Sequence, residues 1–115
     1  MATHDAQMLK GVLSMVLLHL VAQEDDYGYA LVVRLHAEGL TDLSEGSVYP
    51  ALTRLESGGL LSSRLVRSSS GPARKYYVLT TIGRAELARA LTAWHALVDT
   101  VYRVLVTDPH PRSTA

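Results

Sequence analysis

Apolar side chains recur at helical spacing in the first third of the chain. From Met8 onward they fall every three or four residues and cover nearly the whole circumference of the expected helix; residues 1–7, which are polar, are expected to fray. The acidic run at residues 23–26 predicts a turn, and a second helix is expected over residues 27–38, with Gly39 as its stop. Because one small domain covers only one face of the first helix, its other face calls for a partner.

A third helix is predicted to begin after the N-cap Ser44 and to end at Gly58 and Gly59. Its apolar stripe is narrow, and its opposite face is polar. Pro50 lies inside this segment and cannot donate a hydrogen bond to the helical ladder. The helix is therefore expected to kink or to restart at this proline.

The periodicity then changes from that of a helix to that of a strand. Residues 61–67 and 74–79 contain β-branched and aromatic side chains, and a loop rich in Ser, Gly and Pro over residues 68–73 joins them. This pattern predicts a β-hairpin. Both of its strands carry basic side chains, namely Arg64, Arg67, Arg74 and Lys75.

A long last helix is predicted from a cap at Thr80 or Thr81 to about Val106, after which prolines prevent its continuation. Apolar residues alternate at spacings of four and three, as in the seam of a coiled coil. The seam consists of Leu87, Leu91, Trp94, Val98, Val101 and Leu105. At ~1.5 Å per residue the helix is roughly 40 Å long, more than the ~30 Å width of a small domain. It must project, and the same helix of a second chain is the simplest partner.

This order of elements predicts a mainly α-helical fold with a β-hairpin wing, a winged helix-turn-helix with an added helix. We expect a DNA-binding domain over residues 1–79, a dimerisation helix over residues 80–106 and a disordered tail over residues 107–115. In such modules the third helix enters the major groove of double-stranded DNA, and the wing touches the backbone or the minor groove.

The distribution of charge along the chain agrees with DNA binding, although the net charge does not. Eleven basic and eleven acidic residues give a net charge of zero. Residues 1–60 have a net charge of −5 and residues 61–115 a net charge of +5. A basic hairpin or a polar helix face alone is usually just solvated, and only their combination in this order favours DNA binding. The expected DNA contacts are Ser47, Tyr49, Thr53, Arg54, Arg64, Arg67, Arg74 and Lys75.

Five segments resemble the signature of PadR-like transcriptional regulators: residues 9–11, 26–29, 43–56, 58–61 and 74–80. The resemblance extends over about residues 8–106. With its single C-terminal helix, the chain is similar to the small subfamily. It implies a dimeric winged helix repressor, often one that responds to phenolic acids, drugs, other small molecules or metals. For such a dimer we expect a pseudo-palindromic operator whose half-sites lie ~10 bp, one helical turn, or a multiple of that apart.

The resemblance further implies roles for single residues. Pro50 belongs to the family pattern of the third helix, and the positions that match the DNA-facing helix and wing are Tyr49, Thr53, Arg54, Arg74 and Lys75. Tyr27 and Tyr29 match the motif of the second helix, where core packing and contact with a DNA phosphate are equally good explanations.

Trp94 lies in the middle of the seam, where it either anchors a dimer interface or stacks on a ligand. In some small PadR-like proteins, a tryptophan at the matching position lines a central pore between subunits and stacks on flat drugs. The resemblance thus implies a small aromatic effector and no other cofactor, with plain dimer packing as the alternative. The candidate ligand-binding residues are Met8, Val12, Met15, His19, Trp94 and Val98, with Gly11 leaving room.

Other classes of protein find little support. The chain has no cysteine, and its five histidines lack metal-ligand spacing, so no metal site is predicted. No nucleophile motif, phosphate-binding loop or paired carboxylates indicate an enzyme. The absence of cysteine and of a signal peptide fits the cytoplasm, and the nearly apolar segment of residues 12–22 is about half the ~20 residues of a membrane span. The alternatives are a protein-interaction module on the same scaffold and a metal-responsive regulator.

Overall fold

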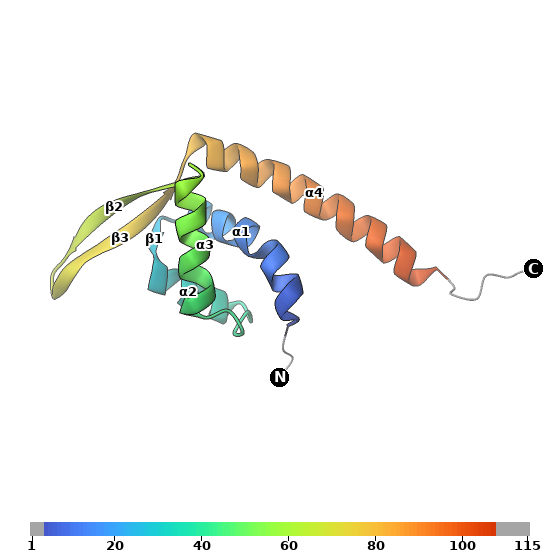
Figure 1. Cartoon of the computed structure of the whole chain (residues 1–115), viewed down its shortest axis with the longest axis horizontal. Helices are drawn as coiled ribbons and strands as arrows, with labels where there is room; N and C mark the ends of the chain where they lie inside the picture. The colour runs from blue at the N-terminus through green and yellow to red at the C-terminus, as the bar shows by residue number, and fades with distance from the viewer. Residues whose placement is uncertain (1–3, 108–115) are drawn as a thin grey trace, which may run out of the picture.

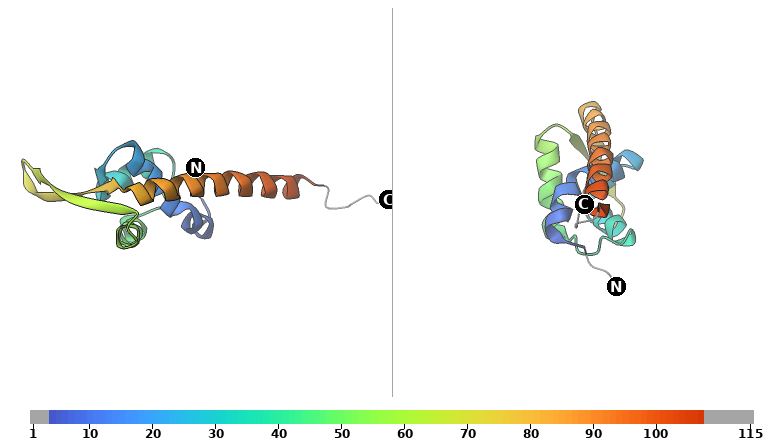
Figure 2. Two further views of the ribbon diagram at one scale, coloured as in Figure 1. Left: turned by 90° about the horizontal axis from the view of Figure 1, so that it is seen from above. Right: turned by 90° about the vertical axis from the view of Figure 1, so that its right-hand side faces the viewer.

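The computed structural model describes residues 4–107, and the tail expected to be disordered lies outside this range from residue 108 onward. The order of elements is α1 (Ala6–Gln23), β1 (Asp26–Tyr27), α2 (Gly28–Ala37), α3 (Glu45–Ser57), β2 (Leu61–Ser68), β3 (Gly71–Leu79) and α4 (Thr81–Val106) (Figure 1). Seen from above, the hairpin of β2 and β3 and the helix α4 point in opposite directions, and each projects beyond the helical domain (Figure 2). The molecule measures 71 × 34 × 20 Å. The predicted winged helix-turn-helix with a long last helix is confirmed.

The core lies between α1, α2, α3 and the base of the sheet. Its largest fully buried side chains are Leu17, Leu18, Val21, Leu31, Leu35, Val48, Leu52 and Leu61. By length and composition alone α1 is long and apolar enough to cross a membrane, which differs from the expectation from sequence. Six of its residues are buried within this core, however, and the core helix of a globular domain passes the same test.

The sheet has three antiparallel strands in the order β1-β3-β2, where the sequence predicts only two. In β1, Asp26 pairs with Tyr77 and Tyr27 pairs with Tyr76. The acidic turn and the start of the second helix were therefore wrongly predicted by one or two residues, because a two-residue strand with a distant partner leaves no periodic signal. The hairpin strands are also longer than expected, and only Ser69 and Ser70 remain between them.

Local capping explains where the helices begin and end. The Asp5 carboxylate accepts hydrogen bonds from the amides of Gln7 and Met8, so α1 begins at Ala6. The fraying expected over residues 1–7 is therefore wrong for Ala6 and Gln7. The helix α3 continues through Pro50 without a break. A proline in the second turn removes one hydrogen bond there, and the packed apolar stripe of α3 compensates for it. Gly59, with φ of +79°, ends α3 in the left-handed conformation that glycine adopts readily.

The start of α4 is locked to the turn that follows α3. The Thr80 hydroxyl accepts a hydrogen bond from the Gly83 amide at 2.9 Å and donates to the carbonyl of Gly59 at 2.7 Å. A Cβ on Gly83 would collide with the Leu60 carbonyl, so this close approach requires glycine. The first turns of α4 then pack on α1, where Leu87 is only 7% exposed.

This packing corrects the predicted seam of α4. Leu87 and Leu91 contact the core of their own chain, whereas the later seam residues Trp94, Val98, Val101 and Leu105 are exposed. A heptad pattern shows which side chains share one face of a helix, but not where the neighbouring domain stops covering that face. Only the outer half of α4 is left for a partner.

Candidate nucleic-acid interface

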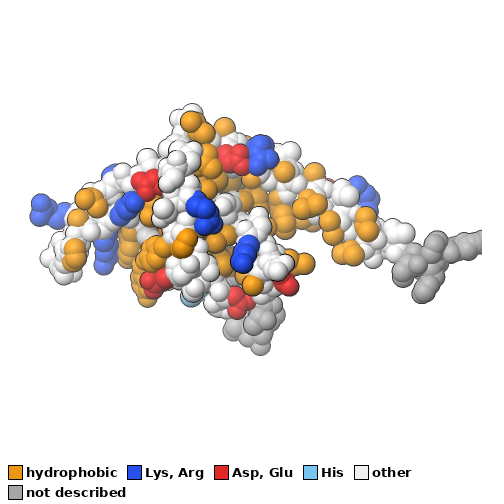
Figure 3. All heavy atoms as spheres, in the orientation of Figure 1, with side chains coloured by type: hydrophobic (Ala, Val, Ile, Leu, Met, Phe, Trp, Pro, Cys, Tyr) orange, Lys and Arg blue, Asp and Glu red, His pale blue; other side chains and the backbone are white. Residues whose placement is uncertain are grey.

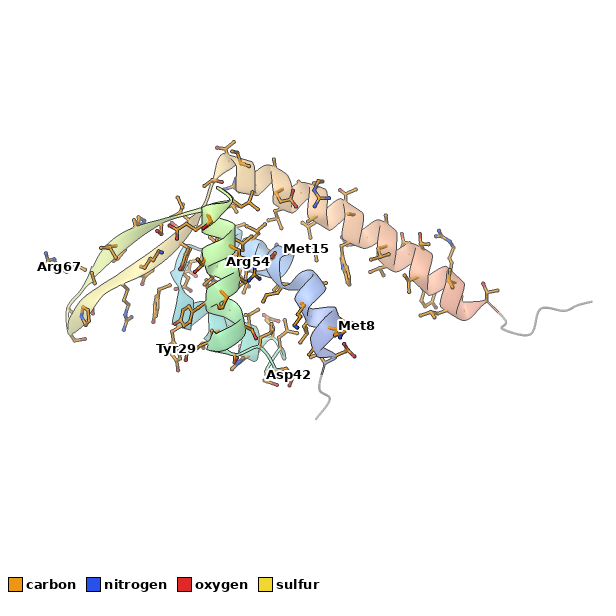
Figure 4. The ribbon with its side chains drawn as sticks, viewed as in Figure 1. Met8, Met15, Tyr29, Asp42, Arg54 and Arg67 are labelled. Atoms are coloured by element: carbon orange, nitrogen blue, oxygen red, sulfur yellow. The ribbon has the colours of Figure 1, made fainter. Side chains whose placement is uncertain are left out.

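The exposed face of α3 carries the four polar residues that the sequence assigns to DNA. Ser47, Tyr49, Thr53 and Arg54 are all exposed, opposite the buried stripe of Val48, Ala51, Leu52 and Leu55. The Thr53 hydroxyl donates to the Tyr49 carbonyl at 3.1 Å, which leaves its lone pairs free to accept. Arg54 points outward from the second half of α3 (Figure 4). This face of α3 thus presents hydrogen-bond donors and acceptors to solvent, while the opposite face packs in the core.

Tyr49 is held in place by the start of α2. Its ring lies against Gly28, and a Cβ at that position would approach Tyr49 Cδ1 to 2.8 Å and Cε1 still more closely. Burial raises the pKa of Tyr49, and the nearby Glu45 and the phenols of Tyr77 and Tyr29 raise it further. At neutral pH the hydroxyl therefore keeps its proton and can donate a hydrogen bond to an anion.

A shallow cleft of about 260 Å³ separates the beginnings of α2 and α3 from β3. It is lined by Tyr27, Gly28, Tyr29, Tyr49, Arg74, Lys75 and Tyr77. The Arg74 guanidinium lies over the Tyr27 ring, 4.5 Å from its centroid, and Tyr27 in turn packs against Tyr76 at 5.3 Å. The cleft joins the helix face to the wing, and its phenol hydroxyls and the Arg74 guanidinium suit a phosphate.

The basic side chains of the wing differ in their surroundings. Lys75 Nζ lies 2.8 Å from the Glu56 carboxylate, and Arg64 lies 3.5 Å from that of Asp25. Within residues 4–107, Arg67 and Arg74 have no carboxylate as an ion-pair partner, and the same holds for Arg54 on α3. Arg67 lies near the tip of the wing (Figure 4). Figure 3 shows basic side chains along the wing and over α3, and others along α4.

Sequence reasoning missed the acidic and hydroxyl groups at this interface. Glu56 accepts a hydrogen bond from the Ser63 hydroxyl at 2.5 Å, and Asp25 pairs with Arg64, 39 positions later in the chain. The charges themselves are visible in the sequence. Their pairing depends on how the wing is oriented against α3, and no local pattern carries that information.

A second cavity, of about 650 Å³, opens between the start of α1 and the outer half of α4. Met8, Val12, Trp94 and Val98 line it, as the predicted ligand site requires, and so does Gly11. Met15 instead packs against the core, and His19 is exposed away from this cavity. The cavity also takes in residues that the sequence does not assign to a ligand: His4, Asp5, Gln7, Leu9, Leu97, Val101, Tyr102 and Leu105.

Metal ligands are the remaining class of candidate site. Among residues 4–107, no three His, Cys, Asp or Glu side chains come together in a group that could hold an ion. His36, the histidine with the shortest polar contact, lies 2.6 Å from the Leu43 carbonyl through Nε2 and helps to shape the turn before α3.

Comparison with known proteins identifies the family. The model of the transcriptional regulator PadR-like family matches residues 17–89. The transcriptional regulator Rv3488 of Mycobacterium tuberculosis is 38% identical over 85 residues, which span 74% of this chain and 78% of that protein. The crystal structure of a PadR-like regulator from Bacillus cereus superposes with a TM-score of 0.81 at 41% identity over 90% of this chain and all of the other. A PadR family regulator from Eggerthella lenta gives a TM-score of 0.81 at 37% identity, with 89% and 88% of the two chains covered. With its helix-turn-helix, its wing and these relatives, the chain belongs to the PadR-like family of transcriptional regulators, which are DNA-binding proteins and not enzymes.

Proposed function

We propose that this protein is a cytoplasmic, homodimeric repressor that binds a pseudo-palindromic operator and responds to a small aromatic effector. The observation that carries the proposal is the continuous surface formed by α3, the tyrosine-lined cleft and the wing, where exposed arginines outnumber acidic groups. On this surface Arg54, Arg67 and Arg74 are available to phosphates or base edges. Tyr27 and Tyr49 both line the cleft, and their hydroxyls can donate hydrogen bonds to a DNA phosphate there.

The outer half of α4 supports a homodimer. Leu97, Val98, Val101, Tyr102 and Leu105 are 41–75% exposed on a helix that extends beyond its own domain. Monomeric proteins rarely leave so large a contiguous apolar surface in water. A two-fold axis through paired α4 helices would cover it and would set the separation of two α3 helices on neighbouring turns of DNA.

The cavity beside Trp94 supports a ligand-responsive mechanism. Met8 and Val12 face Trp94 and Val98 across it, and Met8 is 75% exposed in the free chain. An aromatic molecule held against α4 at a dimer interface would change the angle between the subunits, and thereby the separation of the two recognition helices. Such a molecule releases DNA only insofar as it binds the two arrangements with different affinities.

The test of DNA binding is a salt titration. Genomic fragments retained by the purified protein are sequenced, and binding to the enriched duplex is measured between 50 and 300 mM salt. We expect the affinity to fall steeply as salt rises, because phosphate contacts release counterions. Retention of no common sequence, or an affinity that does not change with salt, would favour the alternative of a protein-interaction module on the same scaffold.

The ligand site is tested through the single tryptophan. Ethidium, added to the DNA-free protein, is expected to quench the fluorescence of Trp94. The tyrosine fluorescence of the tryptophan-free control Trp94→Leu should change much less, because Tyr102 is one of six tyrosines and the other five do not line this cavity. Val98→Trp in the Trp94→Leu background moves the probe by one turn within the same cavity and restores the response. If planar dyes at millimolar concentration leave the fluorescence of the wild type unaltered, the cavity serves dimer packing alone.

A further inference from the structure

Three side chains join the wing to the end of α3. Glu56, in the last turn of α3, accepts a hydrogen bond from the Ser63 hydroxyl of β2 at 2.5 Å and pairs with Lys75 Nζ of β3 at 2.8 Å. Ser63 and Lys75 lie on neighbouring strands, on the face of the sheet that also carries the buried Tyr77. One carboxylate therefore binds both strands of the hairpin.

The ion pair between Glu56 and Lys75 lies at the surface and is partly covered. The side chain of Glu56 is 30% exposed and that of Lys75 49%, and the Lys75 ammonium also lies 5.4 Å from the centroid of the Tyr77 ring. The hydrogen bonds from Lys75 and Ser63 lower the pKa of Glu56, and the bond to Glu56 raises the pKa of Lys75. Both groups are charged at neutral pH, and each neutralises the charge of the other.

Glu56 also lies where a free carboxylate would harm DNA binding. It is seven residues after Tyr49 and three after Thr53, so it follows the same stripe of α3 that carries two of the expected DNA contacts. A bare carboxylate beside a DNA phosphate is repelled, and the ammonium of Lys75 removes that charge. If the Lys75 ammonium moved from Glu56 to a DNA phosphate, it would only replace one anionic partner by another. The Glu56 carboxylate would then be left unpaired beside the DNA.

We propose that Lys75 does not bind DNA, and that Glu56, Lys75 and Ser63 form a strut that fixes the angle between the wing and the recognition helix. The strut sets the separation between Arg67 at the wing tip and the face of α3, and thus the shape of DNA that fits both. Glu56 and Lys75 are positioning residues for recognition, and Arg67 and Arg74 supply the cationic contacts of the wing. This inference rests on the proposed DNA binding.

The two roles of Lys75 predict opposite results for one set of variants. The exchange Glu56→Lys with Lys75→Glu rebuilds the pair in the reverse orientation, with the same total charge. Glu56→Gln with Lys75→Met removes the pair, again without a change in total charge. Arg67→Met is the matched control, since it removes one cation from the same wing, at a residue that has no ion-pair partner among residues 4–107.

Affinity for the enriched duplex is measured for each variant across the salt range. If the strut exists, the affinity of the exchanged variant for DNA is within about twofold of that of the wild type. The Gln/Met variant binds about three- to tenfold more weakly, with an unchanged slope of log Kobs against log salt. Arg67→Met lowers that slope by about 1.8 in a dimer, since each phosphate contact contributes about 0.9. The proposal is overturned if the Gln/Met variant also loses about 1.8 from the slope, or if the exchanged variant fails to bind while folded.

Hydrogen exchange in the DNA-free protein gives a readout that does not depend on DNA. Amides of β2 and β3 near Ser63 and Lys75 are expected to exchange faster in the Gln/Met variant than in the wild type, and to be protected again in the exchanged variant. Equal protection in all three would refute the strut even if every variant bound DNA. If the wild type shows no salt-dependent binding to any duplex, the proposed function fails, and the exchange data still decide whether the strut exists.

Discussion

The contact between Gly28 and Tyr49 allows a sharp test of how the recognition helix is held. Replacing Gly28 by alanine would place a Cβ 2.8 Å from Tyr49 Cδ1, where ordinary contact begins at 3.4 Å, and closer still to Cε1. The backbone of Gly28 lies in α2 and has no positive φ, so the conformation itself accepts alanine. The destabilising part of the effect therefore arises from the ring of Tyr49, which must move away from the new Cβ.

Two terms of opposite sign set the magnitude. Alanine in a helix is favoured over glycine by about 0.5–1 kcal/mol. Overpacking a filled contact costs about 1–3 kcal/mol, and the displaced ring loses its burial against α2. We expect a net loss of about 1–2 kcal/mol in the free energy of unfolding, or roughly 4–12 °C in Tm for a domain of this size. Because the displaced Tyr49 also belongs to the expected interface, the affinity for DNA should fall as well.

Thermal unfolding, followed by circular dichroism at one fixed protein concentration, measures this effect. Gly46→Ala is the matched control, because it lies in α3 and its Cβ would meet only the Ser44 hydroxyl, at 3.5 Å. That variant should be as stable as the wild type or more so. Adding Tyr49→Ala to Gly28→Ala should recover the overpacking cost. A Gly28→Ala protein as stable as Gly46→Ala, with unchanged DNA affinity, would show that Tyr49 is not positioned by α2.

Three further predictions concern other parts of the molecule. Arg34→Ala removes a guanidinium that donates to the Leu20 carbonyl at 2.9 Å at the end of α1, and urea unfolding should show a loss of about 1–2 kcal/mol. Because the pKa of Glu56 is lowered on folding, its stabilisation is present above the ordinary carboxyl value of 4.5 and is lost as the pH falls through the lowered one. Wing amides should lose protection below about pH 4.5 in the wild type, whereas Glu56→Gln should show no such step. Leu105→Glu should raise the dimer dissociation constant, measured by sedimentation, at least about tenfold. Ala96→Glu, on the opposite side of α4, should leave it nearly unchanged. Equal effects of the two substitutions would show that the seam is not the dimer interface.

The sequence predicts the parts of the fold that depend on local physics. Helix boundaries follow from the cap Thr80 and from the glycine at position 59, and the change of period marks the wing. The resemblance to PadR-like proteins, carried by five short segments, is confirmed by the family comparison. Pro50 shows the limit of propensity, since the buried stripe of α3 keeps the helix intact through a residue that opposes it.

The features that sequence reasoning missed all depend on distant partners. The strand β1 exists only because Tyr27 meets Tyr76, 49 positions later, and Leu87 is buried only because α1 packs beneath α4. The basic residues of the wing look equivalent in the sequence, but Lys75 is paired with an acid of α3 and Arg67 is not. The cavity at Trp94 contains four of the six expected ligand residues, and the helical stripe through Met15 and His19 turns away from it.

The central claim is that a dimer of this protein holds DNA through α3 and the arginines of the wing, and the slope of log Kobs against log salt for the enriched duplex tests it most directly. If Arg54, Arg67 and Arg74 of each subunit meet phosphates, the dimer makes six such contacts, and the slope should be about −5. The Gln/Met variant of the strut should keep this slope. A slope near zero for the wild type would contradict the account.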